Sequence, residues 1–427
     1  MSLTVVKLDP RLARLLFLAL AIATLAAAWF FIKWNFANAV ASRIDTGQPE
    51  AASVADWLIG LAPSDPQTHF AAARVFEKTF NPGDLTKSLT EYEFATALSP
   101  NHYVMWISLG KARSLNGDVE SATAAYARAL ALAPHYAAVQ WAYGNALIRQ
   151  GDTENGFAMI ARAAAANPDY GRTTALTALE MFAGDLARVR QVLGESDSTN
   201  ASLAAVLAKQ ERFDESFEAW SKIAGKTTIY EKLGAALVDQ MATAKKFQFA
   251  ARISADIQTG DGEKPVTGQV PNGGFEGGVK LRSAGLFEWQ IADGAQPQIA
   301  LAESGSHGGR YSLVAIFNSF ETGAFRSISQ TVAVVPAAAY ELEVFYKSDL
   351  KTQATLKWEI ADAGNSTSLA TTGAMTPAPE WTSLKVKFTV PAASDGVIIR
   401  ITREGCTGPS CPANGKISFD DFSLRKL

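Results

Sequence analysis

Four prolines of this chain, Pro66, Pro100, Pro134 and Pro168, follow one another at intervals of 34 residues. A strict period of this length indicates a stack of helix–turn–helix units, because one pair of helices cannot bury its apolar face alone. The period therefore predicts an all-α solenoid in this part of the chain. Other residues share the spacing: Gly110 and Gly144; Ala95, Ala129 and Ala163; and Tyr92, Tyr126 and Ile160.

The best-defined copy of the repeat contains Trp106, Leu109, Gly110, Ala122, Tyr126, Ala129 and Pro134. This pattern resembles the tetratricopeptide repeat, with Arg113 where that family usually has Tyr and Tyr126 where it usually has Phe. In such repeats small residues let the paired helices approach, an aromatic ring fills the space between them, and proline stops the second helix. The resemblance covers residues 69–170 and implies a scaffold that binds another protein.

The repeat register ends after Pro168, since Ser202 stands where the next proline would fall. A degenerate unit follows at 203–224, and residues 230–257 have the apolar spacing of one or two further helices. Upstream, residues 51–61 have the character of the second helix of a partial first repeat. Terminal copies of a solenoid are atypical because their outer faces meet solvent. We therefore expect a tetratricopeptide-repeat solenoid over residues 50–258, with about four to six helix pairs.

The first helix of each pair lines the concave groove of such a solenoid. Aligning two copies places Ile107 and Lys111 of one repeat in the groove, with Trp141, Asn145 and Arg149 of the next. Some family members clamp a partner's C-terminal carboxylate there, but Ile107 and Trp141 stand where that clamp needs Lys. A mixed apolar and polar groove for a protein partner is the interpretation we prefer. The alternative is that these residues pack against the neighbouring repeat.

Residues 15–32 form a run of 18 residues without a charge. About 20 apolar residues in a helix cross the hydrocarbon core of a bilayer. Lys7, Arg11 and Arg14 precede the run, so the positive-inside rule places the N-terminus in the cytoplasm. We therefore predict a cytoplasmic tail and a single transmembrane helix over residues 1–36. The protein would then be a single-pass protein of a bacterial inner membrane, with the bulk of the chain in the periplasm.

A cleaved signal peptide is the alternative interpretation of the same segment. Ala37-Asn38-Ala39 has the small-x-small pattern of a cleavage site. The apolar run is longer than the usual core of a signal peptide, so we prefer an uncleaved anchor.

The two cysteines of the chain, Cys406 and Cys411, lie close together in a predicted loop. In an oxidising compartment such a pair predicts a disulfide that closes the loop, and two free thiols are the alternative. Zinc is disfavoured because it requires four ligands and no histidine lies nearby in the sequence. A net charge of −3 argues against a platform for nucleic acid.

The composition of the chain changes after residue 257. Residues 258–274 have the turn-forming residues of a linker, and beyond them the periodicity shifts from helical to alternating. Seven short runs rich in β-branched and aromatic residues follow, at a spacing typical of a β-sandwich. We therefore predict a β-sandwich over residues 265–427, with strands at 311–317, 327–335, 340–346, 354–360, 382–390, 397–402 and 416–424.

Four short motifs lie along this region. They are residues 272–276 (Asn-Gly-Gly-Phe-Glu), residues 309–313 (Gly-Arg-Tyr-Ser-Leu), Trp381 ahead of a strand, and residues 419–424 (Phe-Asp-Asp-Phe-Ser-Leu). Together they resemble the jelly-roll carbohydrate-binding modules of the galactose-binding-like class. The resemblance covers nearly all of 270–427 and implies an all-β jelly-roll sandwich. The predicted fold is thus multidomain, with a transmembrane helix, an all-α solenoid and an all-β sandwich.

The same resemblance implies a structural calcium ion that ties the first strand of the sandwich to the last. Glu276 with Asp420 or Asp421 would supply the side-chain oxygens, which are ligands that Ca²⁺ prefers. The alternative is that the two aspartates accept hydrogen bonds from backbone donors near a strand end. As neighbours on one strand they are expected to point to opposite faces, which does not suit general acid/base work.

Sugar recognition requires aromatic rings that stack on the C–H faces of a pyranose. Trp289, Phe320 and Trp358 are the candidate rings, together with Phe325, whereas the place of Trp381 before a strand indicates a framework residue. Packing in the core is the alternative role for each of these rings.

The sequence contains no nucleophile elbow, no phosphate-binding loop and no His-Glu-x-x-His helix, and His307 lies in a Gly-rich turn without an evident partner. We therefore expect a non-catalytic, membrane-anchored periplasmic scaffold of the bacterial envelope, accessory to polysaccharide assembly or export, that binds a protein partner through its repeats. A glycan-binding or adhesion protein that uses the sandwich is the alternative. A purely structural module of a membrane complex is a third interpretation.

Overall fold

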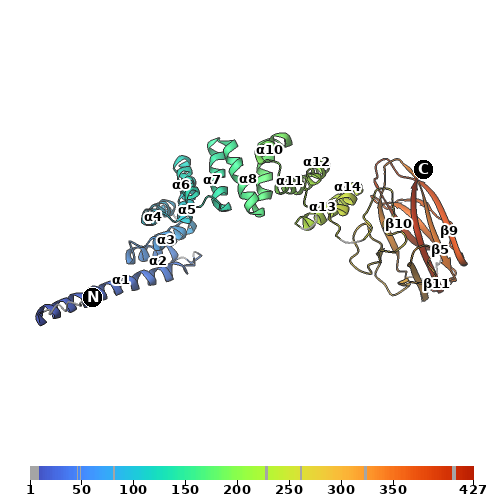
Figure 1. The fold of residues 1–427 in the computed structure, drawn as a ribbon, viewed down its shortest axis with the longest axis horizontal. Helices are drawn as coiled ribbons and strands as arrows, with labels where there is room; N and C mark the ends of the chain where they lie inside the picture. Colours follow the sequence, from blue (N-terminus) through green and yellow to red (C-terminus); the bar gives the residue numbers. More distant parts are fainter. Residues whose placement is uncertain are drawn as a thin grey trace, which may run out of the picture. The chain divides into compact units, whose positions relative to one another are not determined.

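A computed structural model describes residues 9–45, 47–48, 50–79, 82–226, 229–259, 262–321, 325–405 and 410–427. The chain divides into two compact units, Met1–Thr199 and Asn200–Leu427. The first holds the N-terminal helix and most of the helical array, and the second holds the last helices together with the strands (Figure 1). The boundary between the units therefore does not coincide with the predicted linker after residue 257.

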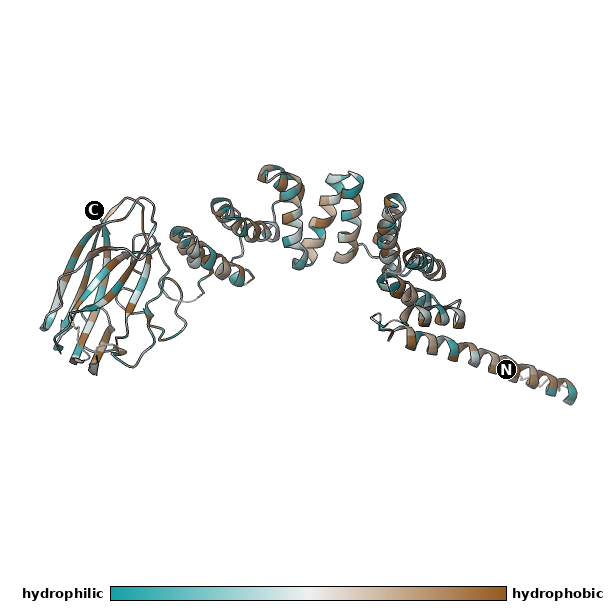
Figure 2. Cartoon of the chain, turned by 180° about the vertical axis from the view of Figure 1, so that it is seen from behind, coloured by the Kyte–Doolittle hydropathy of each residue, from teal (hydrophilic) through white to brown (hydrophobic). Residues whose placement is uncertain are grey.

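Helix α1, Pro10–Ala41, spans 32 residues. Asp9 caps its N-terminus by accepting a hydrogen bond from the backbone N–H of Arg11. The large apolar side chains of α1 are exposed along the helix, which is mostly brown in the hydropathy colouring of Figure 2. By length and composition α1 can cross a membrane, and a signal sequence near an N-terminus has the same properties.

The C-terminal end of α1 is part of the helical array. Ala37 and Ala41 are buried and share one apolar cluster with Leu58 and Ala62. Leu58 belongs to α2, Ala51–Leu61, which the sequence predicts as the second helix of a partial first repeat. The first helix of that pair is therefore the end of α1, and the apolar helix continues into the repeats without a linker.

The further helices described in the first unit pair in sequence order, α3 with α4, α5 with α6, α7 with α8 and α9 with α10. Each pair also contacts the next one along the chain. The predicted helical repeat is confirmed. The bounds are α3 Pro66–Thr79, α4 Asp84–Leu98, α5 Tyr103–Leu115, α6 Val119–Leu132, α7 Ala137–Gln150, α8 Thr153–Ala166, the 3₁₀ turn η1 Pro168–Tyr170, α9 Gly171–Met181 and α10 Leu186–Leu193.

The repeated glycines lie where the two helices of a pair approach most closely. A Cβ atom on Gly110 would lie 2.7 Å from the ring of Tyr126, and one on Gly144 would lie 2.7 Å from the side chain of Ile160. Tyr126 and Ile160 are themselves one repeat apart. The same inter-helix space is thus filled by a large side chain in both copies, and only glycine fits opposite it.

The second unit contains the end of the helical array, with α11 Asp197–Lys209 at the unit boundary, α12 Phe213–Ser221, α13 Glu231–Thr243 and α14 Phe247–Ile257. Trp220 of α12 is buried, and its Nε1–H donates to a carboxylate oxygen of Asp256 in α14 at 2.9 Å. From α3 to α14 the described helices make six pairs, and the end of α1 with α2 adds a seventh, one more than the predicted range.

The strands form two antiparallel sheets. The five-stranded sheet has the order β1-β4-β10-β7-β8, and the other has the order β2-β3-β11-β5-β9 with β6 beside β11. The predicted all-β sandwich is confirmed, and each of its seven predicted strands is present. The bounds are β1 Gln290–Ile291, β2 Gln298–Ala302, β3 Ser312–Glu321, β4 Ile328–Ala333, β5 Ala339–Ser348, β6 Lys351–Thr352, β7 Thr355–Asp362, β8 Ser368–Thr371, β9 Ala378–Thr389, β10 Gly396–Glu404 and β11 Ser410–Lys426.

An apolar core with an aromatic centre fills the space between the two sheets. The rings of Trp289 and Trp358 each pack edge-to-face against Phe422, with centroids 4.7 and 4.8 Å apart. A buried aromatic side chain removes roughly 150–250 Å² from water. These rings are therefore a main source of the stability of the sandwich.

Candidate functional site

Two of the predicted sugar-binding rings lie in the core of the sandwich. Trp289 and Trp358 are 2% and 0% exposed. The indole N–H of Trp289 donates to the backbone oxygen of Asn272 at 3.0 Å. The prediction that these rings form a sugar platform is therefore wrong, because neither presents a face to solvent. The side chain of Phe320 lies outside the described residues, and Phe325 is partly buried against the core.

The outer face of the five-stranded sheet carries a row of polar residues, one from each strand. The register aligns Gln290 with Ser329, Ser329 with Arg400, Arg400 with Glu359, and Glu359 with Thr371. Apolar neighbours of these residues along the strands pack in the core, so alternation directs the row outward. We call these five residues the polar row.

An ion pair lies at the centre of the polar row. Arg400 Nε donates to Glu359 Oε2 at 2.6 Å, and the two side chains are 33% and 12% exposed. Burial favours the neutral acid, but hydrogen bonds from Arg400 and Ser368 outweigh it and hold the pKa of Glu359 below its usual value. The row therefore presents an ionised acceptor beside a fixed guanidinium donor, with the groups of Ser329 and Gln290 on one side and the hydroxyl of Thr371 on the other.

Two of the predicted metal ligands hold one loop of the sandwich. Glu276 Oε1 accepts hydrogen bonds from the backbone N–H groups of Arg310 and Tyr311, both at 2.8 Å. The buried Asp420 accepts from the backbone N–H groups of residues 307–308. Burial raises the pKa of Asp420, and these hydrogen bonds only partly oppose it. The described residues contain no group of three or more His, Cys, Asp or Glu side chains that could hold a metal ion. The hydrogen bonds of Asp420 match the alternative interpretation, in which the carboxylate accepts from backbone donors near a strand end. The calcium site stays a prediction.

Asp420 and Asp421 do not point to opposite faces, as neighbours on a regular strand would. Asp421 has a φ of 47° beside a β-bulge, and its Oδ2 lies 2.6 Å from Nδ1 of His307. His307 also stacks on Phe345, with centroids 3.8 Å apart, and the Trp381 ring meets it edge-on at 5.8 Å. This cluster on the six-stranded sheet was not predicted, because it depends on the bulge. The hydrogen bond from Trp381 Nε1 to a loop carbonyl suits the predicted framework role.

Two predicted groove residues, Lys111 and Ile107, contact neighbouring repeats. Lys111 Nζ lies 2.5 Å from an oxygen of Glu77, whose position is one repeat upstream. Ile107 is partly buried and packs against two apolar clusters of the adjacent helices. Both contacts agree with the alternative in which these side chains join the repeats to one another.

The other three predicted groove residues lie on α7. The ring of Trp141 stacks on Tyr170, with centroids 4.8 Å apart. Asn145 Nδ2 donates to the backbone oxygen of Trp141 at 2.8 Å, and Arg149 is exposed. Partner binding through this surface stays a prediction.

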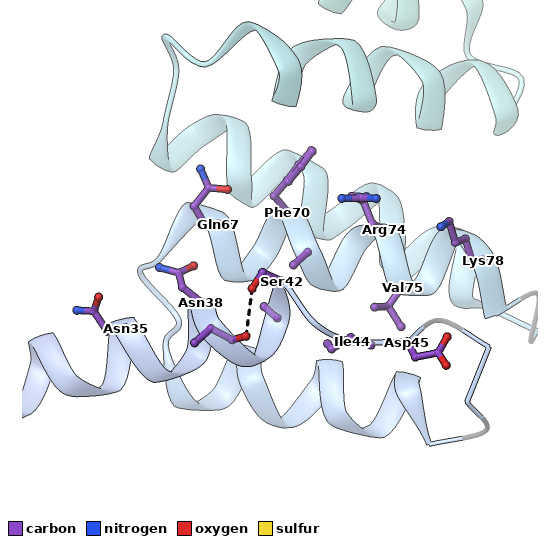
Figure 3. A pocket seen from close by; sticks show the side chains of 13 residues that line it. Asn35, Asn38, Ser42, Ile44, Asp45, Gln67, Phe70, Arg74, Val75 and Lys78 are labelled. Carbon is purple, nitrogen blue, oxygen red and sulfur yellow. Dashed lines mark hydrogen bonds between the residues drawn. The ribbon is translucent and has the colours of Figure 1, made fainter.

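A polar hollow of about 700 Å³ lies between the end of α1 and helix α3. Figure 3 shows Asn38 of α1 and Ser42, which follows the helix, across from Gln67, Phe70 and Arg74 of α3. The hollow opens just beyond the exposed apolar stretch of α1. Sequence reasoning missed it, because it depends on the end of α1 serving as a repeat helix.

The predicted disulfide lies only in part within the described residues. Cys411 is fully buried, and its backbone oxygen accepts a hydrogen bond from Arg403 at 2.6 Å. Cys406 lies outside the described residues. The disulfide between Cys406 and Cys411 stays a prediction.

Solved structures similar to part of this chain include two carbohydrate-binding modules. TmCBM61 in complex with β-1,4-galactotriose is 19% identical, over 36% of this chain and 96% of that chain, with a TM-score of 0.27. A CBM4 domain is 16% identical, over 37% and 99% of the two chains, with a TM-score of 0.28. A double mutant of MamA is 15% identical, over 45% and 92%, with a TM-score of 0.30. No curated protein sequence matches the chain.

The C-terminal sandwich also matches the model of a protein family. Residues 267–408, about a third of the chain, match the model of a carbohydrate binding domain. That span contains the first ten strands and all five residues of the polar row. The C-terminal sandwich of this protein is therefore a carbohydrate-binding-module-like domain.

Proposed function

We propose that this protein binds a glycan through the polar row on the outer face of its five-stranded sheet. The observation that carries the proposal is the match of residues 267–408 to a carbohydrate binding domain, since the row lies within that span. A sugar presents hydroxyl groups that both donate and accept hydrogen bonds. Arg400 and Glu359 offer a donor and an acceptor that hold each other in place, so little side-chain freedom is lost on binding.

Helix α1 anchors the protein, uncleaved, in the inner membrane of a bacterium, and the bulk of the chain lies in the periplasm. The helical continuity of Pro10–Ala41 supports this part of the proposal. Cleavage after Ala39 would cut the helix and remove Ala37, which is 0% exposed and shares a cluster with Leu58. Loss of Ala37 would leave a gap beside Leu58 in this cluster, which favours the uncleaved anchor.

The repeats recruit a protein partner, and the whole is a non-catalytic scaffold accessory to polysaccharide assembly or export. The mixed character of the first helices supports this role: exposed Arg149 lies on the same helix as the Trp141 ring. Apolar anchors flanked by charges suit a peptide or a protein surface. In this arrangement the sandwich meets the glycan and the solenoid holds the machinery that handles it.

Calorimetric titration of the full chain in detergent with neutral and acidic oligosaccharides tests the proposed function. Glu359→Gln removes the ionised acceptor of the polar row and is expected to weaken glycan binding about tenfold or more. The matched control is Glu343→Gln, which removes an ion pair with Lys385 on the outer face of the other sheet. Absence of binding to every saccharide, or equal losses in both variants, would contradict the proposal.

A further inference from the structure

A second hollow lies beside the polar row, at the edge of the five-stranded sheet. It has a volume of about 820 Å³ and is lined by residues 281–283, by residues 291–294 at the end of β1, and by Arg326. Segment 291–294 follows Gln290 directly, and Arg326 lies three residues before Ser329. A glycan on the row would therefore reach the hollow with its next sugar residues.

Three charged side chains, Arg282, Asp293 and Arg326, line this hollow. None of them forms an ion pair with another residue in the described part of the chain. Arg326 is nevertheless held in place, because its Nε donates to the backbone oxygen of Ala292 at 2.6 Å. Its backbone N–H donates to the oxygen of Gln296 at 2.7 Å. The guanidinium is thus oriented by the protein while its remaining N–H groups stay available.

We infer that this hollow binds the carboxylate of an acidic sugar residue, with Arg282 and Arg326 as its donors. The inference rests on the proposed function, since it gives the class of glycan that the sandwich takes. Guanidinium groups pair with carboxylates through two parallel hydrogen bonds, which fixes the orientation of the ligand. Asp293 and Ser283 then serve the neighbouring hydroxyl groups.

The charge of the hollow favours a carboxylate over a phosphate. Two arginines and one aspartate give a net charge of +1, which a single carboxylate neutralises. A phosphate carries up to two charges, so it would leave a net negative charge in the hollow and be repelled by Asp293. An acidic sugar supplies both the anion and the donors.

The test is calorimetric titration of the full chain in detergent with tetragalacturonate and with its methyl ester, in which each charged carboxylate is replaced by a neutral methyl ester. We expect saturable binding of the acid, at least tenfold weaker binding of the ester, and weakening of acid binding by rising salt. Arg282→Gln and Arg326→Gln should each weaken binding of the acid about tenfold or more. Lys426→Gln, which removes an exposed charge elsewhere on the sandwich, is the matched control.

Arg282 is exposed and forms no hydrogen bond or ion pair within the part of the chain that the structure describes. Arg282→Gln therefore remains informative if Arg326→Gln fails to fold. Equal binding of acid and ester, or unchanged binding in Arg282→Gln, would overturn the inference and leave the proposed function intact. Displacement of the acid by inorganic phosphate at equal concentration would overturn the assignment to a carboxylated sugar. Failure of every saccharide to bind would overturn the proposed function as well.

Discussion

The carboxylate of Asp395 accepts a hydrogen bond from the backbone N–H of Phe247 at 2.8 Å, across 148 residues of sequence. Its other oxygen accepts from the N–H of Gln248 at 3.1 Å. Lys246, at the N-cap of α14, makes no capping bond with its own side chain. The loop before β10 therefore supplies the cap that the helix lacks. Gln248 adds a bond to the backbone oxygen of Val334, so α14 belongs with the sandwich.

Replacing Asp395 by Ala is expected to loosen α14 from the sandwich. Loss of a side-chain N-cap costs about 1 kcal/mol, which lowers the Tm of a unit of this size by about 2–4 °C. Thermal unfolding of the full chain measures the lower Tm. Faster proteolysis at residues 258–264 measures the loosening of α14 from the sandwich. Asp395→Asn keeps one oxygen acceptor and is the matched control. Identical melting and proteolysis of wild type and Asp395→Ala would show that the cap does not couple the two parts.

The mature protein extracted from membranes is expected to contain peptides that span residues 37–39. Helix α1 runs through that segment without interruption, and Ala37 is part of the core of the first repeat. Mass spectrometry of the N-terminal peptides is the measurement. A mature N-terminus at residue 40 would establish the signal peptide instead.

Substitutions at Ala37 and Ala39 test whether the end of α1 is buried against the repeats. Ala37→Glu buries an unpaired charge and is expected to cost about 3–5 kcal/mol of stability in the first unit. Ala39→Glu is the matched control, because Ala39 is exposed two residues later. Equal melting of the two variants would mean that the end of α1 does not pack on Leu58.

The 34-residue period was sufficient to predict the helical array, because the close approach of Gly110 to Tyr126 is repeated one unit later by Gly144 and Ile160. The period could not locate the start of the array. Ala37 and Ala41 are small and apolar, so they suit a membrane helix as well as a repeat core. Only their contact with Leu58 distinguishes the two roles.

Strand alternation predicted the seven longer strands but not the site on the sandwich. Trp289 and Trp358 are rings that suit a sugar platform or a core equally well by residue type, and packing decides between the two. The polar row depends on the register of strands as far apart in the sequence as Gln290 and Arg400. A single sequence gives no information on that register. The cap that Asp395 provides was not predictable for the same reason.

The buried His69 in α3 is held between two acceptors. Its Nδ1 lies 2.5 Å from Glu91 Oε2, and its Nε2 lies 2.9 Å from the backbone oxygen of Pro63. Donation from both nitrogens requires the protonated ring. Burial alone lowers the pKa of His69, but hydrogen bonds to Glu91 and Pro63, with the charges of Glu91 and Asp65, outweigh it and raise the pKa above its usual value.

The first unit is therefore expected to lose stability as the pH rises through the raised pKa of His69. The unfolded pKa is about 6.5, so the contribution is fully present below that pH and disappears above the higher folded pKa. Melting curves between about pH 5.5 and 9 measure the loss, and His69→Gln should remove this part of the pH dependence. His135→Gln, at an exposed histidine, should not. An unchanged slope in His69→Gln would assign the pH dependence to another group.

Asp420 is expected to stabilise the sandwich whether or not calcium is present. Asp420→Ala leaves the backbone N–H groups of residues 307–308 without their acceptor, which costs about 1–3 kcal/mol. Melting is measured for both proteins in EDTA and in excess calcium, with Glu303→Gln, at an exposed carboxylate, as the control. The hydrogen bonds predict the same difference in both conditions. If wild type and Asp420→Ala melt together in EDTA and differ only in calcium, then the carboxylate acts as a metal ligand, and the calcium site implied by the family resemblance is the correct interpretation.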